Sequence, residues 1–286
     1  NASSAKFTGR LNLFMLMNRI DFWLRLLVLL SMGLMWVGLS GCASNSSGWS
    51  GADDLGSQAE ESDARKRARL RLQLATGYFE QGQTSVALEE VRLALQIDSG
   101  FANALNLRGL IYMRLNESRL AEDSFKRALS LNPKDPNTAH NLGWLLCQLN
   151  RFPEANQWFA QALNQPGYAG RSKTHLTQGL CHMRAGNKAD AEASLRRSYD
   201  LDASNPATAY NLGLLMFQRE QWRSAQTYLK RLNSSSLANA ESLWLGIKVE
   251  RRLEQLEAAN LLGEQLRKRF PQSVELSAWL RGAYDE

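Results

Sequence analysis

Residue types that mark several other classes of protein are scarce in this 286-residue chain. It contains only 6 Pro and 3 Cys, and it lacks the runs of Val, Ile and Thr that are typical of strands. Hydrophobic residues make up 44% of the chain, and Leu and Ala dominate most of it. This composition favours an all-helical protein with room for one large or two small domains.

Catalytic and metal-binding motifs are also missing. The chain has no HExxH, GxSxG, P-loop or paired-glycine fingerprint. His175 and His182 are seven residues apart, too far for the i, i+4 pair that binds a metal on one helix. Acidic pairs such as Glu89-Glu90 are typical of solvated surface. We therefore expect no enzymatic activity, no metal, no cofactor and no small-molecule substrate.

Positive charge is not concentrated in the body of the chain. The formal charge is +6, and residues 1–41 contribute +3 of it. No dense basic block follows, so the charge does not require a nucleic-acid partner, and none is predicted. Cys147 and Cys181 show no CxxC or metal-ligand spacing, and we expect two buried free thiols. A disulfide between them stays open if the body lies in an oxidising compartment.

The amino-terminal segment has the pattern of an export signal. Basic Arg19 and Arg25 precede an apolar run of about 14 residues, short of the roughly 20 that span a bilayer. The run ends in Leu39-Ser40-Gly41-Cys42, which resembles the lipobox of bacterial lipoproteins. An uncleaved membrane anchor is the alternative. The chain begins with Asn1, and Met15 or Met17 is a candidate start.

The lipobox resemblance implies that residues 1–41 are a signal peptide and that Cys42 becomes the lipidated first residue. Residue 43 is Ala and not Asp. In that family Asp at this position retains many lipoproteins at the inner membrane, so its absence implies export to the outer membrane of a Gram-negative bacterium. Residues 42–63 are rich in Ser, Gly and Asp and predict a flexible tether.

One pattern recurs through the predicted domain at residues 64–286. A small residue is followed twelve positions later by Ala, and the copies are about 34 residues apart, which is the period of tetratricopeptide repeats. Each copy predicts two antiparallel helices that cross where the small residues lie. Turns between the two helices are expected at Gly82, Asn116, Asn150 and Gly186-Asn187, and Asn132-Pro133 and Asn205-Pro206 are expected to end or start helices. The expected fold is all-α: a right-handed superhelical solenoid of six tetratricopeptide-type helix pairs with a closing C-terminal helix. The six pairs are Ala75/Ala87, Gly109/Ala121, Gly143/Ala155, Gly179/Ala191, Gly213/Ala225 and Gly246/Ala258.

Residues on the first helix of each copy that lie off the repeat consensus are expected to line the inner, concave face. They are apolar and aromatic with Asn and His between them, which suits an amphipathic helix laid into a groove. Packing against neighbouring helices is the alternative for any one of them. The predicted partner-binding groove consists of Arg69, Leu72, Thr76, Phe79, Asn103, Asn106, Leu110, Met113, Asn137, His140 and Trp144, with Cys147, Tyr210, Leu214 and Phe217 at corresponding positions.

Lipobox, tether and six repeats together resemble the type IV pilus biogenesis and stability lipoproteins, the tetratricopeptide-repeat pilotins. The segment Arg269-Phe270-Pro271, followed by Ala278-Trp279-Leu280-Arg281-Gly282, is similar to that family's closing helix. The resemblance implies a lipid-anchored protein of the outer membrane whose body faces the periplasm. It also implies that the chain binds the pilus secretin subunit and promotes its targeting and multimerisation. The alternative is a periplasmic scaffold for cell-wall or envelope-assembly proteins.

Overall fold

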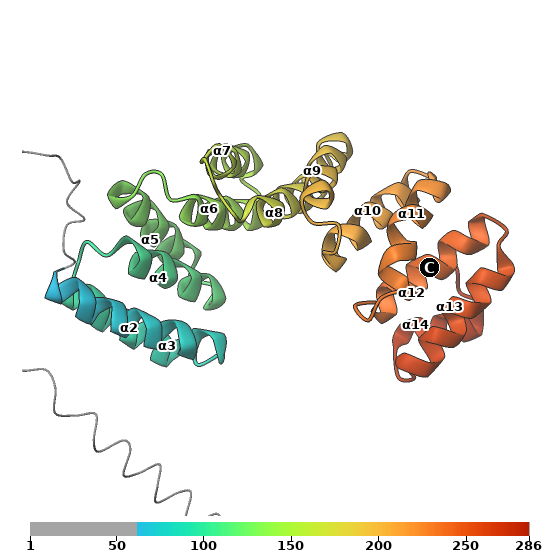
Figure 1. Cartoon of the computed structure of the whole chain (residues 1–286), viewed down its shortest axis with the longest axis horizontal. Helices are drawn as coiled ribbons and strands as arrows, with labels where there is room; N and C mark the ends of the chain where they lie inside the picture. The colour runs from blue at the N-terminus through green and yellow to red at the C-terminus, as the bar shows by residue number, and fades with distance from the viewer. Residues whose placement is uncertain (1–61, 286) are drawn as a thin grey trace, which may run out of the picture. The chain divides into compact units, whose positions relative to one another are not determined.

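The computed structural model describes residues 62–285. These residues fold into helices joined by short turns and contain no strand, which confirms the expected all-α class. Figure 1 shows that the helices follow one another as a solenoid. The predicted signal peptide, the lipid attachment at Cys42 and nearly all of the tether lie outside the described residues.

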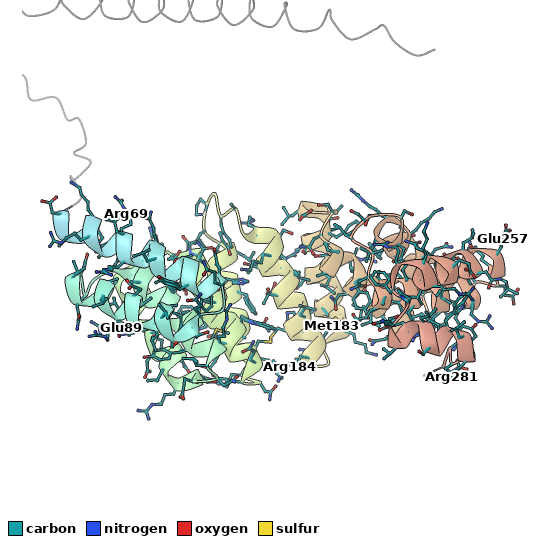
Figure 2. All side chains as sticks on the ribbon, turned by 90° about the horizontal axis from the view of Figure 1, so that it is seen from below. Arg69, Glu89, Met183, Arg184, Glu257 and Arg281 are labelled. Carbon is teal, nitrogen blue, oxygen red and sulfur yellow. A yellow bond between two sulfur atoms is a disulfide. The ribbon has the colours of Figure 1, made fainter. Side chains whose placement is uncertain are left out.

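Twelve of the helices form six antiparallel pairs, one for each predicted repeat, and a shorter helix closes the stack. In chain order the helices are α2 (Asp63–Glu80), α3 (Thr84–Ile97), α4 (Ala102–Arg114), α5 (Ser118–Leu131), α6 (Pro136–Gln148), α7 (Phe152–Leu163), α8 (Arg171–Arg184), α9 (Lys188–Leu201), α10 (Pro206–Gln218), α11 (Trp222–Asn233), α12 (Ala240–Arg252), α13 (Leu256–Arg269) and α14 (Val274–Arg281). Arg69 lies near the first end of this domain and Arg281 near the last (Figure 2).

The turn inside each pair reverses the chain through one residue with left-handed backbone. Gly82 and Gly186 have φ of 77° and 79°, and Asn116 and Asn150 have φ of 60° and 61°. Glycine and asparagine adopt this conformation most readily, which is why the sequence marked these four positions as turns. Copies five and six place Glu220 and Glu254 there instead, so glutamate accepts the conformation that the tight turn imposes.

Helix starts use side-chain caps and prolines. The Asp135 side chain accepts hydrogen bonds from the backbone N–H groups of Asn137 and Thr138, and Pro136 occupies the first turn of α6. Asn205 caps α10 in the same way, directly before Pro206. These groups satisfy N–H donors that have no partner within the helix. Asn205-Pro206, expected to end or start a helix, starts α10.

A small residue on the first helix faces a large residue sixteen positions later on the second. Gly109 lies against the ring of Phe125, and a Cβ added at Gly143 would lie 2.8 Å from Cδ1 of Phe159. Phe125 and Phe159 are fully buried. This contact confirms that the helices cross at the small residues, because any larger side chain would push them apart.

The sixth copy departs from the predicted register by one residue. Its buried alanine is Ala259, 2% exposed, and not Ala258. The residue equivalent to Gly109 is then Ile247, and the residue sixteen positions later is Gly263. In copy six the large residue therefore lies on the first helix and the small residue on the second, the reverse of the earlier copies. The prediction of Gly246/Ala258 was wrong because Gly246 stands directly before the equivalent position.

The exchange in copy six makes room for the closing helix. A Cβ on Gly263 would overlap the indole ring of Trp279 on α14, so the indole occupies the space above the glycine. Arg267 lies over the same ring, with Cζ 5.2 Å from its centroid. Helix α14 contacts both α12 and α13 and covers the end of the stack. The predicted closing helix is therefore present, over Val274–Arg281.

Candidate protein-binding surface

The first helices of the six pairs form a continuous layer. Each of α2, α4, α6, α8 and α10 contacts the next first helix along the chain as well as its own partner, and α12 contacts α10 and its own partner α13. In Figure 1, α6 and α8 lie on the concave side of the row, and α7 and α9 lie on its convex side. A segment bound on the concave side would therefore meet side chains from several repeats.

Most of the predicted groove residues keep accessible surface on this layer. Four of the polar residues are exposed. The apolar residues, together with Asn106, are half-buried against the core, and the outer surfaces of the apolar ones form an apolar strip across α2, α4 and α6. The exposed residues are Arg69, Thr76, Asn103 and Asn137, and the half-buried residues are Leu72, Phe79, Asn106, Leu110, Met113 and Trp144. Tyr210, Leu214 and Phe217 are half-buried on α10.

His140 does not line the groove as expected. It is 5% exposed, and its Nδ1 lies 2.9 Å from Oγ1 of Thr174 on α8. The hydroxyl of Tyr168 lies 2.9 Å from the same oxygen, which completes a buried polar network. Burial, with a smaller contribution from the charge of Lys173, lowers the pKa of His140 to about 4. The imidazole is therefore neutral at pH 7 and holds α6 against α8.

Cys147 is also in the core, and it is joined to Cys181 by a disulfide between α6 and α8 with a Cα–Cα distance of 5.8 Å. The expectation of two free thiols was wrong. The cysteines are 34 residues apart, while copies three and four are offset by 36, so Cys181 lies two residues earlier in its copy. That offset brings it opposite Cys147. In the sequence, the two cysteines are separated by about one repeat, which indicates that they lie on neighbouring first helices and can come into contact.

Polar contacts tie neighbouring first helices together within the predicted groove. Asn141 donates a hydrogen bond of 3.0 Å to Oδ1 of Asn106, which joins α6 to α4. The guanidinium of Arg114 lies 3.6 Å from the ring centroid of Phe79 and also donates to the carbonyl oxygen of that residue. Asn106 and Phe79 thus have structural contacts as well as accessible surface.

The corrected register of copy six adds residues that sequence reasoning missed. Trp244, Lys248 and Arg251 occupy the inner-face positions of α12. Tyr284 stacks on Trp244 with ring centroids 5.6 Å apart, and Arg251 lies 3.7 Å from the Tyr284 centroid. The last copy therefore turns an aromatic and cationic face inward, part of which the chain's own tail covers.

Two further observations concern the described residues alone. Within residues 62–285, no group of three or more His, Cys, Asp or Glu side chains is arranged to hold a metal ion. None of the helices in that range is both long enough and apolar enough to cross a membrane.

Known proteins share both the repeats and their arrangement. Models of the tetratricopeptide repeat match residues 102–135 and 124–157. The chain is 31% identical to PilW, described as a widely conserved type IV pilus biogenesis factor, and the match covers 75% of this chain and 99% of PilW with a TM-score of 0.68. The chain belongs to the PilF and PilW family of tetratricopeptide-repeat proteins of type IV pilus biogenesis.

Relatives from Pseudomonas aeruginosa agree with this assignment. The type IV pilus assembly protein PilF is 28% identical over 85% of this chain and 93% of its own length. A solved structure of PilF covers 77% of this chain and all of the other, with 27% identity and a TM-score of 0.68. The expected fold class is thus confirmed, and so is the expected family at the level of PilF- and PilW-like tetratricopeptide-repeat proteins of type IV pilus biogenesis.

Proposed function

We propose that the chain is a pilotin: an outer-membrane lipoprotein that binds secretin subunits and promotes their targeting and multimerisation in type IV pilus biogenesis. The observation that carries the proposal is the apolar strip on the first helices of copies one to three, in a chain that belongs to the PilF and PilW family. Leu72, Leu110, Met113 and Trp144 supply half-buried apolar surface along this strip. Such a surface suits the apolar face of an amphipathic helix.

The proposed location of the protein is based on the features of its amino-terminal segment. Cys42 carries the lipid that anchors the chain to the inner leaflet of the outer membrane, and the body faces the periplasm. Residues 43–63 form a tether with a span of roughly 25 Å if they behave as a flexible coil. Holding the repeats close to the membrane raises the local concentration of bound secretin subunits there.

Removal of the lipid tests the escort step. In a Cys42→Ala variant expressed in a strain that lacks the native gene, we expect the repeat domain to be made and secretin multimers in the outer membrane to fall sharply. Heat-resistant multimers are measured by immunoblot of separated membranes. Full multimer assembly by this variant would contradict the proposal.

Substitution on the strip tests the binding surface. Leu110→Asp places a charge on the half-buried inner face, and Leu131→Asp is the matched control on α5, where Leu131 is 47% exposed. We expect secretin capture by purified protein to be lost with Leu110→Asp and retained with Leu131→Asp. Equal capture by both variants would place binding elsewhere. Thermal melts show whether both variants fold.

The alternative is a scaffold for cell-wall or envelope-assembly proteins that uses the same strip. Repeat solenoids bind diverse partners, and a tetratricopeptide-repeat protein from Parabacteroides merdae shares the fold at 19% identity with a TM-score of 0.53. Affinity capture of the lipidated chain from membranes separates the two functions. Recovery of a peptidoglycan hydrolase without secretin would favour the scaffold.

A further inference from the structure

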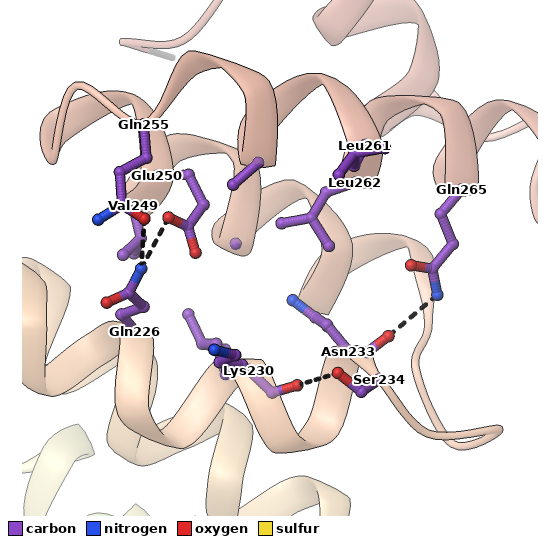
Figure 3. A pocket seen from close by; sticks show the side chains of 13 residues that line it. Gln226, Lys230, Asn233, Ser234, Val249, Glu250, Gln255, Leu261, Leu262 and Gln265 are labelled. Atoms are coloured by element: carbon purple, nitrogen blue, oxygen red, sulfur yellow. Dashed lines mark hydrogen bonds between the residues drawn. The ribbon is translucent and has the colours of Figure 1, made fainter.

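A pocket of about 270 Å³ lies between α11, α12 and α13, away from the inner face. Figure 3 shows its two long walls, α11 and α13. On α12 it is lined by Gly246 and Glu250, whereas Trp244 and Lys248 occupy inner-face positions. At 100° per residue, Gly246 and Glu250 project from the side of α12 opposite to those two residues. The pocket is therefore separate from the strip assigned to the secretin.

Copy five breaks a repeat rule at this pocket. Eight residues after the buried alanine, the second helix of each earlier copy carries a large side chain: Leu95, Leu129, Leu163 and Tyr199. Copy five has Asn233 there, 4% exposed. Its Nδ2 donates to the carbonyl oxygen of Ser242 at 2.9 Å and packs on Gly246, where no side chain competes for the space. Its Oδ1 is buried and has no hydrogen-bond partner among the described residues.

A buried carboxylate lies in the same pocket. Glu250 is 8% exposed and accepts one hydrogen bond, at 2.8 Å, from Nε2 of Gln226. Within residues 62–285, no lysine or arginine forms an ion pair with Glu250, and this includes Lys230 in the lining of the pocket. Buried carboxylates are rarely left without a counter-charge, and each can accept about four hydrogen bonds. Glu250 thus has unused acceptor capacity in the wall of the pocket.

The rest of the wall is apolar. Leu229 and Val249 are 2% and 1% exposed, and Leu262 is half-buried beside them. Leu261 lies at the mouth and is 67% exposed. A ligand that fits this lining has an aliphatic stem for the leucines and hydrogen-bond donors for the carboxylate. An arginine side chain has both parts, because its stem packs on apolar surface while its fork of N–H groups matches a carboxylate.

We propose that this pocket is a second binding site, which takes an arginine side chain presented by a partner protein. The guanidinium donates to Glu250, and the stem lies against Leu229 and Leu262. Binding here leaves the inner strip free, so the chain can hold two partners at once. The inference does not depend on the identity of the inner-face partner.

Small probes test the chemistry on the full chain. N-acetyl-arginine methylamide stands for an arginine within a protein, agmatine for a free guanidinium amine, and N-acetyl-citrulline methylamide for a neutral isostere. We expect the arginine probe to shift the side-chain amide resonances of Gln226 and Asn233 saturably, and the citrulline probe to bind at least about tenfold more weakly. Absence of saturation, or equal binding of citrulline, overturns the proposal. Binding of agmatine alone would overturn the assignment to a partner protein.

Substitutions in the pocket test whether the arginine probe binds there. Glu250→Gln keeps the shape and removes the charge, and Ala258→Phe fills the pocket from α13 with Glu250 intact. We expect both to reduce binding of the arginine probe at least about tenfold, whereas the control Glu257→Gln, at an exposed position on the same helix, leaves it unchanged. Circular dichroism melts show which variants fold. Unchanged binding in a folded Glu250→Gln or Ala258→Phe variant overturns the proposal.

Discussion

Copies three and four and copy six solve the same packing problem in different ways. In copy three, Gly143 on the first helix receives the ring of Phe159 from the second, and a disulfide and a buried histidine join this copy to the next. In copy six, the large Ile247 lies on the first helix and Gly263 on the second, and Trp279 of α14 fills the space. An internal copy has neighbours on both sides, whereas the last copy needs a cap. Helix α14 acts as that cap.

Phe159→Ala is expected to give the largest effect and tests the internal half of this comparison. Phe159 is fully buried and packs on Gly143, so truncation leaves a cavity that the glycine cannot fill. We expect a loss of about 3–5 kcal/mol in the free energy of unfolding. Urea denaturation followed by circular dichroism measures it. A loss near that of Trp279→Ala would show that internal and terminal copies are equally tolerant.

Removal of the disulfide is expected to give the second-largest loss of stability. Replacing Cys147 and Cys181 together by alanine releases a loop of 34 residues between the linked positions. We expect this to destabilise the domain by about 3–4 kcal/mol, because the unfolded chain regains entropy. Hydrogen exchange by mass spectrometry should show faster opening of α6 and α8. Protection of α14 is the internal control, and equal loss of protection there would contradict the local effect.

Burial of His140 predicts that the stability of copies three and four depends on pH. His140 has a pKa lowered to about 4 by burial, while the unfolded chain protonates its histidines near 6.5. The unfolded state therefore binds more protons below pH 6.5. Stability from neutral His140 is fully present above pH 6.5 and is lost as the pH falls towards 4, by about 2–3 kcal/mol.

Urea midpoints measured between pH 7 and pH 4 test this loss. His140→Asn keeps a polar group near Thr174 and removes the titration, so its midpoint should fall less over that range. The pKa values of His175 and His182 are lowered by burial too, so some pH dependence remains in the variant. Identical profiles for the two proteins would exclude His140 as a cause.

Trp279→Ala is expected to give the smallest effect. Trp279 is only half-buried, and its loss should cost about 1–2 kcal/mol, confined to the end of the stack. Hydrogen exchange should rise in α13 and α14 while α6 to α9 stay protected. Gly263→Ala should have a similar local effect, because its Cβ overlaps the indole. Loss of protection throughout the domain would mean that the cap supports the whole solenoid.

Much of this architecture could be predicted, because repetition makes each copy a check on the others. Small residues at a fixed offset, and Gly82, Asn116, Asn150 and Gly186 at the turns, located the helix pairs. Copy six was placed one residue off because Gly246 resembles the consensus, and only packing shows that Ile247 has the equivalent place. The inner face was located by helical period alone, which cannot tell a half-buried Trp144 from a buried His140.

The sequence by itself determined the all-α class, the repeat period and the positions of the turns, since these follow from local spacing and from backbone preferences. Tertiary structure decided what depends on the offset between neighbouring copies. The two extra residues of copy three bring Cys181 opposite Cys147, and the exchange of Ile247 and Gly263 admits Trp279. Asn233 packs on Gly246 and lines a pocket because the glycine leaves room for its amide. Such contacts join residues far apart in the chain, and their distances are set by how whole helices pack.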